Sequence, residues 1–167
     1  MSEIFLTELR RDDSAILFNW INDRSLVILN NNYDPIHEIN HDNWFTNIIQ
    51  KKDVRIFAIR LVSNEEIIGI CQLFNIDFIN SNAELQIRIG NSTYQGKGLG
   101  REAVKAVLQY SFNDLGLHRV YLKVFSTNVY AIKAYQKLGF NQEGILKEAA
   151  FINGRFIDIL MMAILNK

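Results

Sequence analysis

Three glycines at alternate positions, Gly96, Gly98 and Gly100, separate two stretches with different apolar patterns. Residues 83–89 alternate as a half-buried strand does, and residues 99–112 have the apolar spacing of a helix. Glycine lets the backbone take a positive φ and approach a ligand closely, and the start of a helix presents free N–H groups and a partial positive charge. Phosphate oxygens suit such a site. The sequence therefore predicts a phosphate-binding loop.

Spacing excludes two familiar phosphate loops. A Walker A loop needs G-x-x-x-x-G-K-[ST], but Asn91 stands where the first glycine should be and Gly98 where the hydroxyl should be. Gly98, Gly100 and Ala103 fit the dinucleotide pattern G-x-G-x-x-A by letter. However, those glycines follow their strand only after a loop, and the next expected strand, residues 120–125, ends without the ribose-binding carboxylate.

The third pattern is Q-x-x-G-x-G, which begins at Gln95. It resembles the pyrophosphate loop of the GNAT N-acetyltransferase family. A second stretch, N-V-Y-A-I-K-A-Y-Q-K-L-G-F from Asn128 to Phe140, has every fixed position of that family's later motif N-x-x-A-x-x-x-Y-x-x-x-G-F. The resemblance covers residues 67–165, and within that family it is similar to bacterial enzymes that acetylate ribosomal proteins, spermidine and amino sugars.

The resemblance implies one N-acetyltransferase domain over residues 1–167, of the α/β class. It implies a mixed, twisted sheet of six or seven strands flanked by about four helices. The apolar patterns predict the elements in order. Expected strands cover 4–9, 54–61, 67–74, 83–89, 119–125, 141–147 and 156–165, and expected helices begin at 12–14 and 34–35 and cover 99–112 and 129–137. Asn153-Gly154 suits the last hairpin turn.

By the same resemblance, acetyl-coenzyme A is the co-substrate and no metal takes part. Backbone N–H groups of the loop would hold the pyrophosphate, and unpaired main-chain groups of the preceding strand would hold the pantetheine. Asn128 is predicted to cap a helix and to touch the coenzyme as well. The expected coenzyme-binding residues are Ile87, Arg88, Ile89, Gln95, Gly96, Lys97, Gly98, Leu99, Gly100, Arg101 and Asn128.

Acetyl transfer from a thioester needs a neutral amine and a proton for the departing thiolate. Tyr135 occupies the position whose hydroxyl protonates the thiolate in the resembling family. It also falls on an apolar stripe, which suits a plain core aromatic. For the general base we expect Glu84, whose pKa partial burial would raise. A chain of water molecules is the alternative base.

The acceptor amine is expected to bind to the first half of the chain, where two helices build a substrate wall in the resembling family. The expected acceptor contacts are Trp20, Tyr33, His41, Trp44 and Gln86. The second half is similar to spermidine acetyltransferases and to enzymes acting on ribosomal protein N-termini, and the first half to enzymes acting on amino sugars of nucleotide-sugars. Polyamine, amino sugar and protein N-terminus stay open, as does a non-catalytic acyl-coenzyme A binding module.

A rival motif lies in the first half, where residues 37–41 spell H-E-x-x-H, a zinc hydrolase pattern. The chain has only three histidines, and Pro35 should place His37 in the first turn of a helix rather than in its middle. We therefore expect no metal site here. Cys71 lies in an apolar strand without a neighbouring histidine, so we expect a core residue rather than a nucleophile.

Composition limits the partners. The 167 residues suit one domain, and 18 basic residues balance 18 acidic ones. This balance removes the usual electrostatic argument for a nucleic acid or a membrane surface as partner. With no secretory signal, no membrane-spanning apolar run and one cysteine, the protein is expected to be cytoplasmic. An exposed sheet edge near residues 156–165 is compatible with a homodimer.

Overall fold

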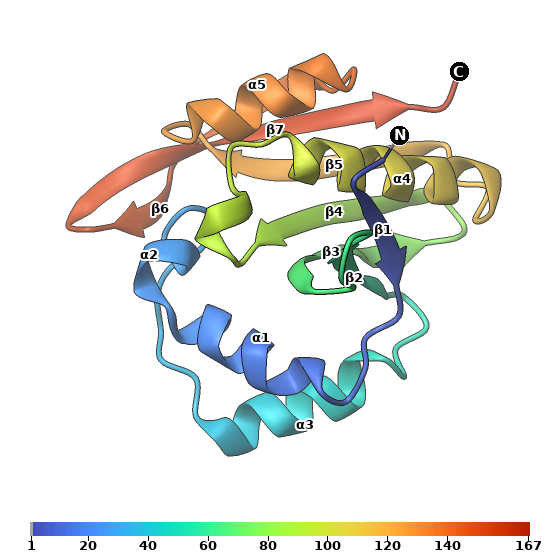
Figure 1. The fold of residues 1–167 in the computed structure, drawn as a ribbon. Helices are drawn as coiled ribbons and strands as arrows, with labels where there is room; N and C mark the ends of the chain where they lie inside the picture. Colours follow the sequence, from blue (N-terminus) through green and yellow to red (C-terminus); the bar gives the residue numbers. More distant parts are fainter. Residues whose placement is uncertain (1) are drawn as a thin grey trace.

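A seven-stranded sheet runs through the protein in the order β1-β2-β3-β4-β5-β7-β6 (Figure 1). The structure is a computed structural model that describes residues 2–167. The strands are β1 (Ile4–Thr7), β2 (Arg55–Leu61), β3 (Ile67–Asp77), β4 (Asn82–Ile89), β5 (Arg119–Phe125), β6 (Asn141–Ile152) and β7 (Arg155–Leu165). The helices are α1 (Asp13–Asn22), α2 (Arg24–Val27), α3 (Glu38–Ile48), α4 (Leu99–Asn113) and α5 (Val129–Lys137), with a 3₁₀ turn at Ser92–Tyr94.

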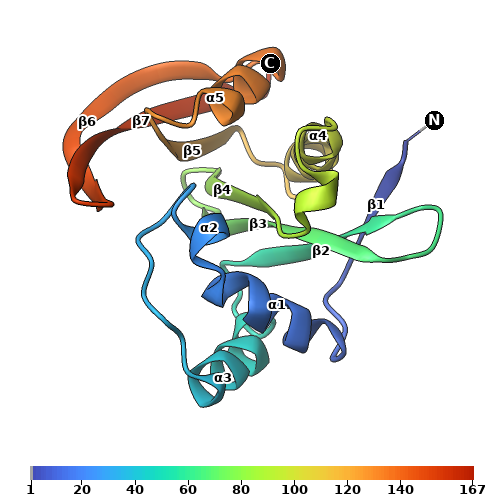
Figure 2. The ribbon, with the colours of Figure 1, turned by 60° about the vertical axis from the view of Figure 1, so that its left-hand side comes forward.

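The sheet opens at its centre, between β4 and β5. All other neighbours are antiparallel, but β4 and β5 are parallel and pair over three residues only, Asn82–Glu84 against Arg119–Tyr121. Beyond Glu84 the two strands diverge, while β4 stays paired with β3 and β5 with β7. Figure 2 shows β5, β6 and β7 curving away from the β1–β4 half of the sheet. The divergence leaves one edge of β4 unpaired where the chain approaches the glycine loop.

Two hydrophobic cores lie on opposite faces of the sheet. The larger joins α4 to the sheet, with Val104 and Val107 from the helix fully buried beside Cys71 of β3. The smaller joins α1 and α2 to the other face, where Trp20 packs with Ile70 of β3. In Figure 2, α1 and α3 lie on one side of β2, β3 and β4, and α4 lies on the other. A site that is open to both faces of the sheet must therefore lie in the opening between β4 and β5.

Several predicted boundaries need correction. Within residues 2–167 the predicted strand number is confirmed with seven strands, and five α-helices form, of which the short α2 is the one without a periodic signal. Helix α3 begins at Glu38 and not at Pro35. The reason is the side chain of Asn22, which accepts from Ile36 N–H at 2.8 Å and donates to Ile36 C=O at 3.0 Å, keeping that segment out of the helix.

The last hairpin is longer than predicted. Strand β6 continues to Ile152, with register shifts at two places that hide its alternation in the sequence. At one of them Glu148 has a φ of 50°, and its N–H donates to Asp158 Oδ1 at 2.8 Å. The turn at Asn153-Gly154 is confirmed, with φ values of 49° and 78° as a tight hairpin turn needs.

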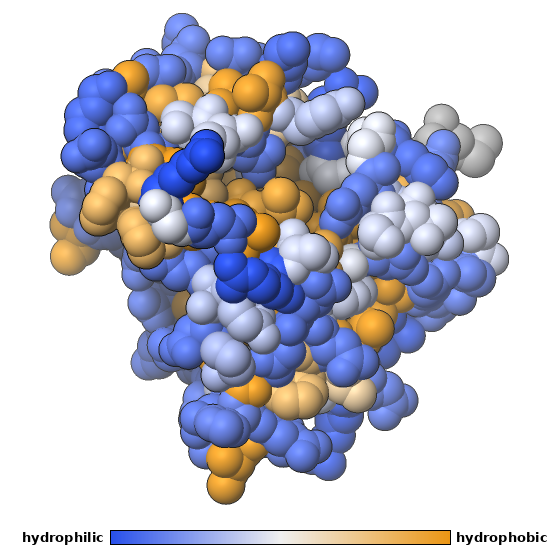
Figure 3. All heavy atoms as spheres, turned by 90° about the vertical axis from the view of Figure 1, so that its left-hand side faces the viewer, coloured by the Kyte–Doolittle hydropathy of each residue, from blue (hydrophilic) through white to orange (hydrophobic). Residues whose placement is uncertain are grey.

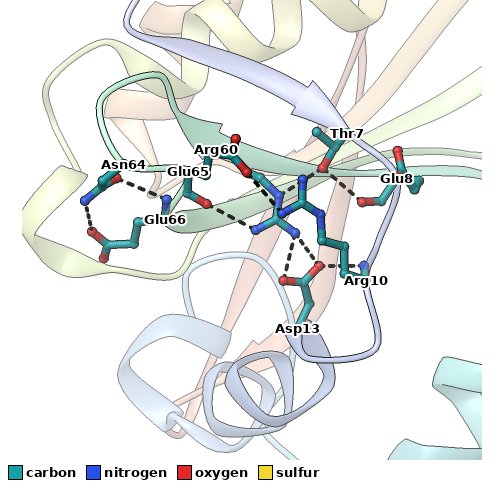
Figure 4. Close-up of polar contacts among 8 residues, drawn as sticks. All are labelled: Thr7, Glu8, Arg10, Asp13, Arg60, Asn64, Glu65 and Glu66. Atoms are coloured by element: carbon teal, nitrogen blue, oxygen red, sulfur yellow. Dashed lines mark hydrogen bonds and ion pairs between the residues drawn. The ribbon is translucent and has the colours of Figure 1, made fainter.

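An ion pair inside the protein fixes the start of α1 against the sheet (Figure 4). The Nη2 of Arg60 on β2 donates to Asp13 Oδ2 at 2.7 Å and to Oδ1 at 2.9 Å, and both side chains are 5% exposed. Asp13 Oδ2 also accepts from Arg10 N–H at 2.7 Å, and Arg60 Nε donates to Thr7 Oγ1. The sequence predicted only that a helix begins at residues 12–14. The ion pair and its hydrogen bonds also join β1, β2 and α1. They thereby hold in place α1, one of the helices expected to form the substrate wall.

Candidate active site

The opening between β4 and β5 forms a groove of about 470 Å³. Leu85 to Ile89 of β4 form one wall and Tyr130 to Leu138 of α5 contribute to the other. Because β4 has no strand partner on this edge after Glu84, its main-chain N–H and C=O groups there need water or a ligand. Figure 3 shows this side of the molecule hollowed, with hydrophobic atoms inside the hollow and hydrophilic atoms around it. An extended ligand with amide groups fits such an edge.

The glycine loop closes one end of the groove. Gly96 and Gly98 have φ values of 73° and 85°, which residues with a Cβ rarely adopt. Gly98 is also the residue before α4 and has no side chain to cap the first N–H groups of that helix. Gln95 lies on the groove wall and donates from Nε2 to Ile89 C=O at 2.9 Å, which ties the loop to the end of β4. The loop thus has the free donors that an anion requires.

Charge in the groove has one sign. The charged residues on its wall are all basic: Arg88, Arg101, Lys123, Lys133 and Lys137. The chain as a whole has no net charge, so this concentration is local. Cations that line a groove with apolar walls attract an anionic ligand. A ligand with several phosphates is the chemistry that the groove suits.

Tyr135 reaches the groove from α5 and is half-buried, packed against the larger core. Its ring packs edge-on against Phe140 at 5.6 Å between centroids. Burial raises the pKa of the Tyr135 phenol, and the nearby Cys71 raises it further. The hydroxyl is therefore protonated throughout the neutral range, although the raised pKa also makes it a weaker acid than an exposed phenol. Cys71 is a buried free thiol whose own pKa is raised by burial, so it is not a thiolate nucleophile.

A second cavity, of about 330 Å³, lies between the helices α1 and α3 and strands β3 and β4. Gln86, Ile87 and Arg88 line both this cavity and the groove. The remaining wall carries Trp20 and Ile21 of α1, and residues of α3 and β3. Two cavities that meet at one short stretch of β4 can hold two molecules with their reacting groups in contact. We call the second cavity the acceptor cavity.

The structure brings most of the predicted acceptor residues together and leaves one out. Trp20, His41, Trp44 and Gln86 all line the acceptor cavity. Tyr33 does not: its hydroxyl donates to Asn22 C=O at 3.3 Å, and its ring faces Arg24 at 5.6 Å. Tyr33 therefore lies outside the acceptor cavity, in the segment that precedes α3.

Glu84, the predicted base, lines neither cavity. It is 7% exposed. Its Oε2 accepts from Asn75 Nδ2 at 3.3 Å, and its Oε1 lies 3.7 Å from Lys123 Nζ. The carboxylate is thus already engaged by a cation and an amide. Tyr121 lies close enough that Glu84, after burial, helps to raise the pKa of that phenol.

Most of the predicted coenzyme residues line the groove, including Ile87, Arg88, Ile89 and the loop glycines. Leu99 is an exception, because its side chain is buried in the larger core. Lys97 also lies off the groove wall, with Nζ 5.4 Å from the ring centroid of Tyr94. Asn128 lines the groove and caps α5 as predicted, accepting from Ala131 N–H at 3.2 Å and donating to Leu29 C=O.

The histidines of the H-E-x-x-H motif do not converge. His37 precedes α3 and is exposed, whereas His41 is 4% exposed. The Nε2 of His41 lies 2.9 Å from Ser14 C=O and 3.2 Å from Ser14 Oγ, so α1 occupies that nitrogen. Within residues 2–167, no group of three or more His, Cys, Asp and Glu side chains is arranged to hold a metal ion.

Sequence reasoning missed several polar residues. Gln72 lies opposite Gln86 in the β3–β4 register and donates from Nε2 to Gln86 Oε1 at 2.6 Å. Strand alternation could have placed both on one face once the register was known. Lys133 and Lys137 are four residues apart on α5, a spacing that puts both on one side of the helix. Their direction relative to the groove depends on the strand divergence, which no local pattern encodes.

Gly90, just after β4, packs against Trp20, one of the residues that line the acceptor cavity. A Cβ built there would lie 2.0 Å from Cδ2 and 2.2 Å from Cε2 of Trp20. We expect Gly90→Ala to lower the free energy of unfolding by about 1–3 kcal/mol and to raise the KM for the acceptor, because the indole must move. Urea unfolding and steady-state kinetics measure both. Gly144→Ala is the matched control, since no atom lies within 4 Å of its added Cβ, and equal effects of the two changes would contradict this explanation.

Comparison with known proteins agrees with the two cavities. Residues 3–141 match the family model of the acetyltransferase (GNAT) domain. The chain is 34% identical to the spermidine N(1)-acetyltransferase of Vibrio cholerae, over 99% of this chain and 94% of that protein. It superimposes on a crystal structure of that organism's spermidine N-acetyltransferase in complex with CoA and spermine with a TM-score of 0.90, at 32% identity, covering 98% of this chain and 95% of the other.

A dodecameric structure of the V. cholerae enzyme is also similar, with a TM-score of 0.84 and 33% identity over 98% of this chain and 94% of that one. This protein therefore belongs to the GNAT family and is an acetyl-CoA-dependent N-acetyltransferase. None of the helices in the described residues is both long and apolar enough to span a membrane.

Proposed function

We propose that this protein, as one domain over residues 1–167, transfers the acetyl group of acetyl-CoA directly to a primary amine while both substrates are bound. The observation that carries the proposal is the meeting of the groove and the acceptor cavity at Gln86–Arg88. A thioester lying along β4 and an amine in the acceptor cavity would then react without a covalent enzyme intermediate. The buried, protonated Cys71 supports direct transfer, because it offers no thiolate to carry the acetyl group.

In this proposal the free edge of β4 binds the pantetheine amides, and the α4 N-terminus with its glycine loop binds the pyrophosphate. Arg101 is on the groove wall beside the loop and adds a charge-assisted contact. Lys133 and Lys137 supply further positive charge along α5. Asn128 would meet the coenzyme at the start of the same helix. Each of these groups holds or orients the coenzyme and takes no part in the bond changes.

Tyr135 is the proposed general acid. The amine nitrogen attacks the thioester carbon, the C–S bond breaks, and the Tyr135 hydroxyl gives its proton to the thiolate sulfur. The proton lost by the amine leaves through water in the acceptor cavity. We favour water over Glu84 because Glu84 lines neither cavity and is held by Lys123 and Asn75.

The kinetic pattern tests this proposal. Initial rates of free-thiol release, measured while acetyl-CoA and acceptor are both varied, should give intersecting double-reciprocal lines. Parallel lines would mean that the acetyl group first moves to the enzyme, and would contradict direct transfer. Spermidine is the first acceptor to try, because it is the substrate in the name of the V. cholerae relative.

We also propose that the protein self-associates through the β6–β7 hairpin, although residues 156–165 are not the exposed edge that the sequence predicted, because β7 lies between β5 and β6. Ile145, Leu146, Phe151 and Phe156 are all exposed on this hairpin, and the two Phe rings lie 4.9 Å apart. Exposed apolar groups clustered in this way mark contact surfaces, and a dodecamer of the V. cholerae relative has been solved. Sedimentation velocity of Phe156→Glu should show a smaller species than the wild type, and an unchanged sedimentation coefficient would sink the idea. The cytoplasm is the proposed compartment, in keeping with the free Cys71 thiol.

A further inference from the structure

The carboxylate of Glu66 binds the segment that leads into the glycine loop, although Glu66 itself lines neither the groove nor the acceptor cavity. Glu66 is half-buried and directly precedes β3. Its Oε1 accepts from Asn91 Nδ2 at 3.1 Å, and its Oε2 accepts from Tyr94 Oη at 3.1 Å. Asn91 precedes the 3₁₀ turn and Tyr94 is its last residue. One side chain therefore fixes both ends of the turn that enters the loop.

The turn between β2 and β3 holds Glu66 in place. The N–H of Glu66 donates to Asn64 Oδ1 at 3.1 Å, and its Oε2 also accepts from Asn64 Nδ2 at 3.4 Å (Figure 4). The C=O of Glu66 accepts from Leu61 N–H at 3.0 Å, which closes the hairpin. Because its backbone and carboxylate are both held, Glu66 loses little further side-chain freedom when it binds the loop segment.

Tyr94 connects this support to the loop itself. Its ring lines the groove and packs against the larger core. The Nζ of Lys97, the residue between Gly96 and Gly98, lies 5.4 Å from the centroid of that ring, where a cation is attracted to the π face. Desolvation and, after it, the Glu66 carboxylate raise the pKa of the Tyr94 phenol, so the hydroxyl stays a donor at neutral pH.

The glycines of the loop have no side chains through which they could be held. A Cβ built at Gly96 would meet no atom within 4 Å. Glycine loses more conformational freedom on ordering than any other residue, so a glycine loop that orders only on binding lowers the affinity for its ligand. Support from the neighbouring segment removes part of that loss. Gln95 provides one such contact through Ile89 C=O, and Glu66 provides the other.

The sign of the charge on Glu66 indicates that geometry is what it contributes. A negative charge near an anion-binding loop opposes the anion, so Glu66 does not help the coenzyme through its charge. A carboxylate is an acceptor on both oxygens and can satisfy two donors at once. Asn91 presents its Nδ2 as one of these donors because its Oδ1 already accepts from Thr93 N–H at 3.0 Å. The Tyr94 hydroxyl is the second donor.

We propose that Glu66 is a positioning residue for the coenzyme, which acts through Asn91 and Tyr94 to hold the glycine loop in the conformation that binds the pyrophosphate. The proposal rests on the proposed binding of acetyl-CoA in the groove and adds a residue that touches neither substrate. Glu66 supports binding and takes no part in the bond changes. Its loss should therefore raise the Kd and the KM for acetyl-CoA and leave kcat, and the KM for the acceptor, unchanged.

Glu66→Gln and Glu65→Gln form a matched pair. Both remove a negative charge from the same hairpin turn, but Glu65 is exposed and its carboxylate binds Arg10. The new amide at position 66 has a single acceptor oxygen, so Asn91 or Tyr94 loses its partner. We expect Glu66→Gln to raise the calorimetric Kd for acetyl-CoA about three- to tenfold, the factor that corresponds to one net hydrogen bond. Glu65→Gln should leave this Kd unchanged.

A double-mutant cycle tests the route of the effect. Tyr94→Phe keeps the ring on the groove wall and removes the hydroxyl, and we expect it alone to raise the Kd for acetyl-CoA about threefold. Glu66→Ala removes both acceptor oxygens, so Tyr94→Phe has no contact with Glu66 left to break in that background. The double variant should therefore bind acetyl-CoA as tightly as Glu66→Ala alone.

Each other outcome has a distinct meaning. Equal changes in Kd for Glu66→Gln and Glu65→Gln overturn the positioning role and leave the proposed function standing. A fall in kcat at unchanged Kd also overturns it, as does a double variant in which the two losses add in full. If the wild type binds no acetyl-CoA, the proposed function itself is overturned.

Discussion

Replacing Tyr135 by phenylalanine is expected to lower kcat by about 10²- to 10³-fold, the usual contribution of a positioned general acid. The phenol lines the groove from α5, and burial keeps its pKa above the ordinary value, so it holds a proton at neutral pH. Phenylalanine retains the packing against Phe140 and removes the proton. Steady-state kinetics and calorimetry should show kcat reduced while the Kd for acetyl-CoA changes little.

The control for that substitution is Tyr110→Phe. Tyr110, on α4, packs edge-on against Phe57 of β2 and lines neither cavity, so loss of its hydroxyl should leave kcat unchanged. The pH profile adds a further test. Because burial raises the pKa of Tyr135, the acid form persists above its ordinary value of 10.0, and the rate should not fall on its account between pH 7 and 10. Full activity of Tyr135→Phe would remove the hydroxyl from the mechanism.

Removing Asp13 is expected to have the largest effect on stability. Asp13→Ala leaves the Arg60 guanidinium buried without its carboxylate, which typically costs about 3–5 kcal/mol of unfolding free energy. Both Asp13 oxygens accept from Arg60 Nη2, and one also accepts from Arg10 N–H (Figure 4). The change therefore unties the start of α1 as well. Urea unfolding followed by circular dichroism measures the loss.

Two further variants test whether the expected loss of stability comes from leaving a charge buried without its partner or from losing any ion pair. Glu65→Gln breaks the Arg10–Glu65 pair, whose side chains are 47% and 62% exposed, and should cost about 0–1 kcal/mol. The double change Asp13→Leu with Arg60→Met removes both charges together and should recover much of the stability lost in Asp13→Ala. If Asp13→Ala costs no more than Glu65→Gln, the buried pair is not what holds α1 to the sheet.

Local patterns were enough for the elements that carry the coenzyme motifs. Helix α5 begins and ends at the predicted residues, because Asn128 caps it and its apolar stripe is regular. The tight turn at Asn153-Gly154 and the glycine loop before α4 also follow from residue type alone. Each of these features depends on interactions within a few residues of the chain.

Contacts between distant segments account for what the sequence did not reveal. The predicted base Glu84 is engaged by Lys123, a residue of β5 whose Nζ only the folded sheet brings to 3.7 Å from Glu84 Oε1. Helix α3 begins later than Pro35 because Asn22, a residue of α1, holds Ile36 out of the helix. Within residues 2–167, no carboxylate lines the acceptor cavity, a result of how α1, α3 and β3 meet that no local pattern encodes.

Calorimetric titration of acetyl-CoA into the wild-type protein tests the central claim, that the coenzyme binds in the opening between β4 and β5. The account predicts one site per chain, with an affinity that falls as salt is added, because Arg101, Lys133 and Lys137 line the groove. Ala134→Phe, which places a ring into the groove, should abolish the heat of binding, whereas Ala149→Phe on exposed β6 should not. If acetyl-CoA binds Ala134→Phe as tightly as the wild type, or does not bind the wild type, the claim that the coenzyme lies between β4 and β5 is contradicted.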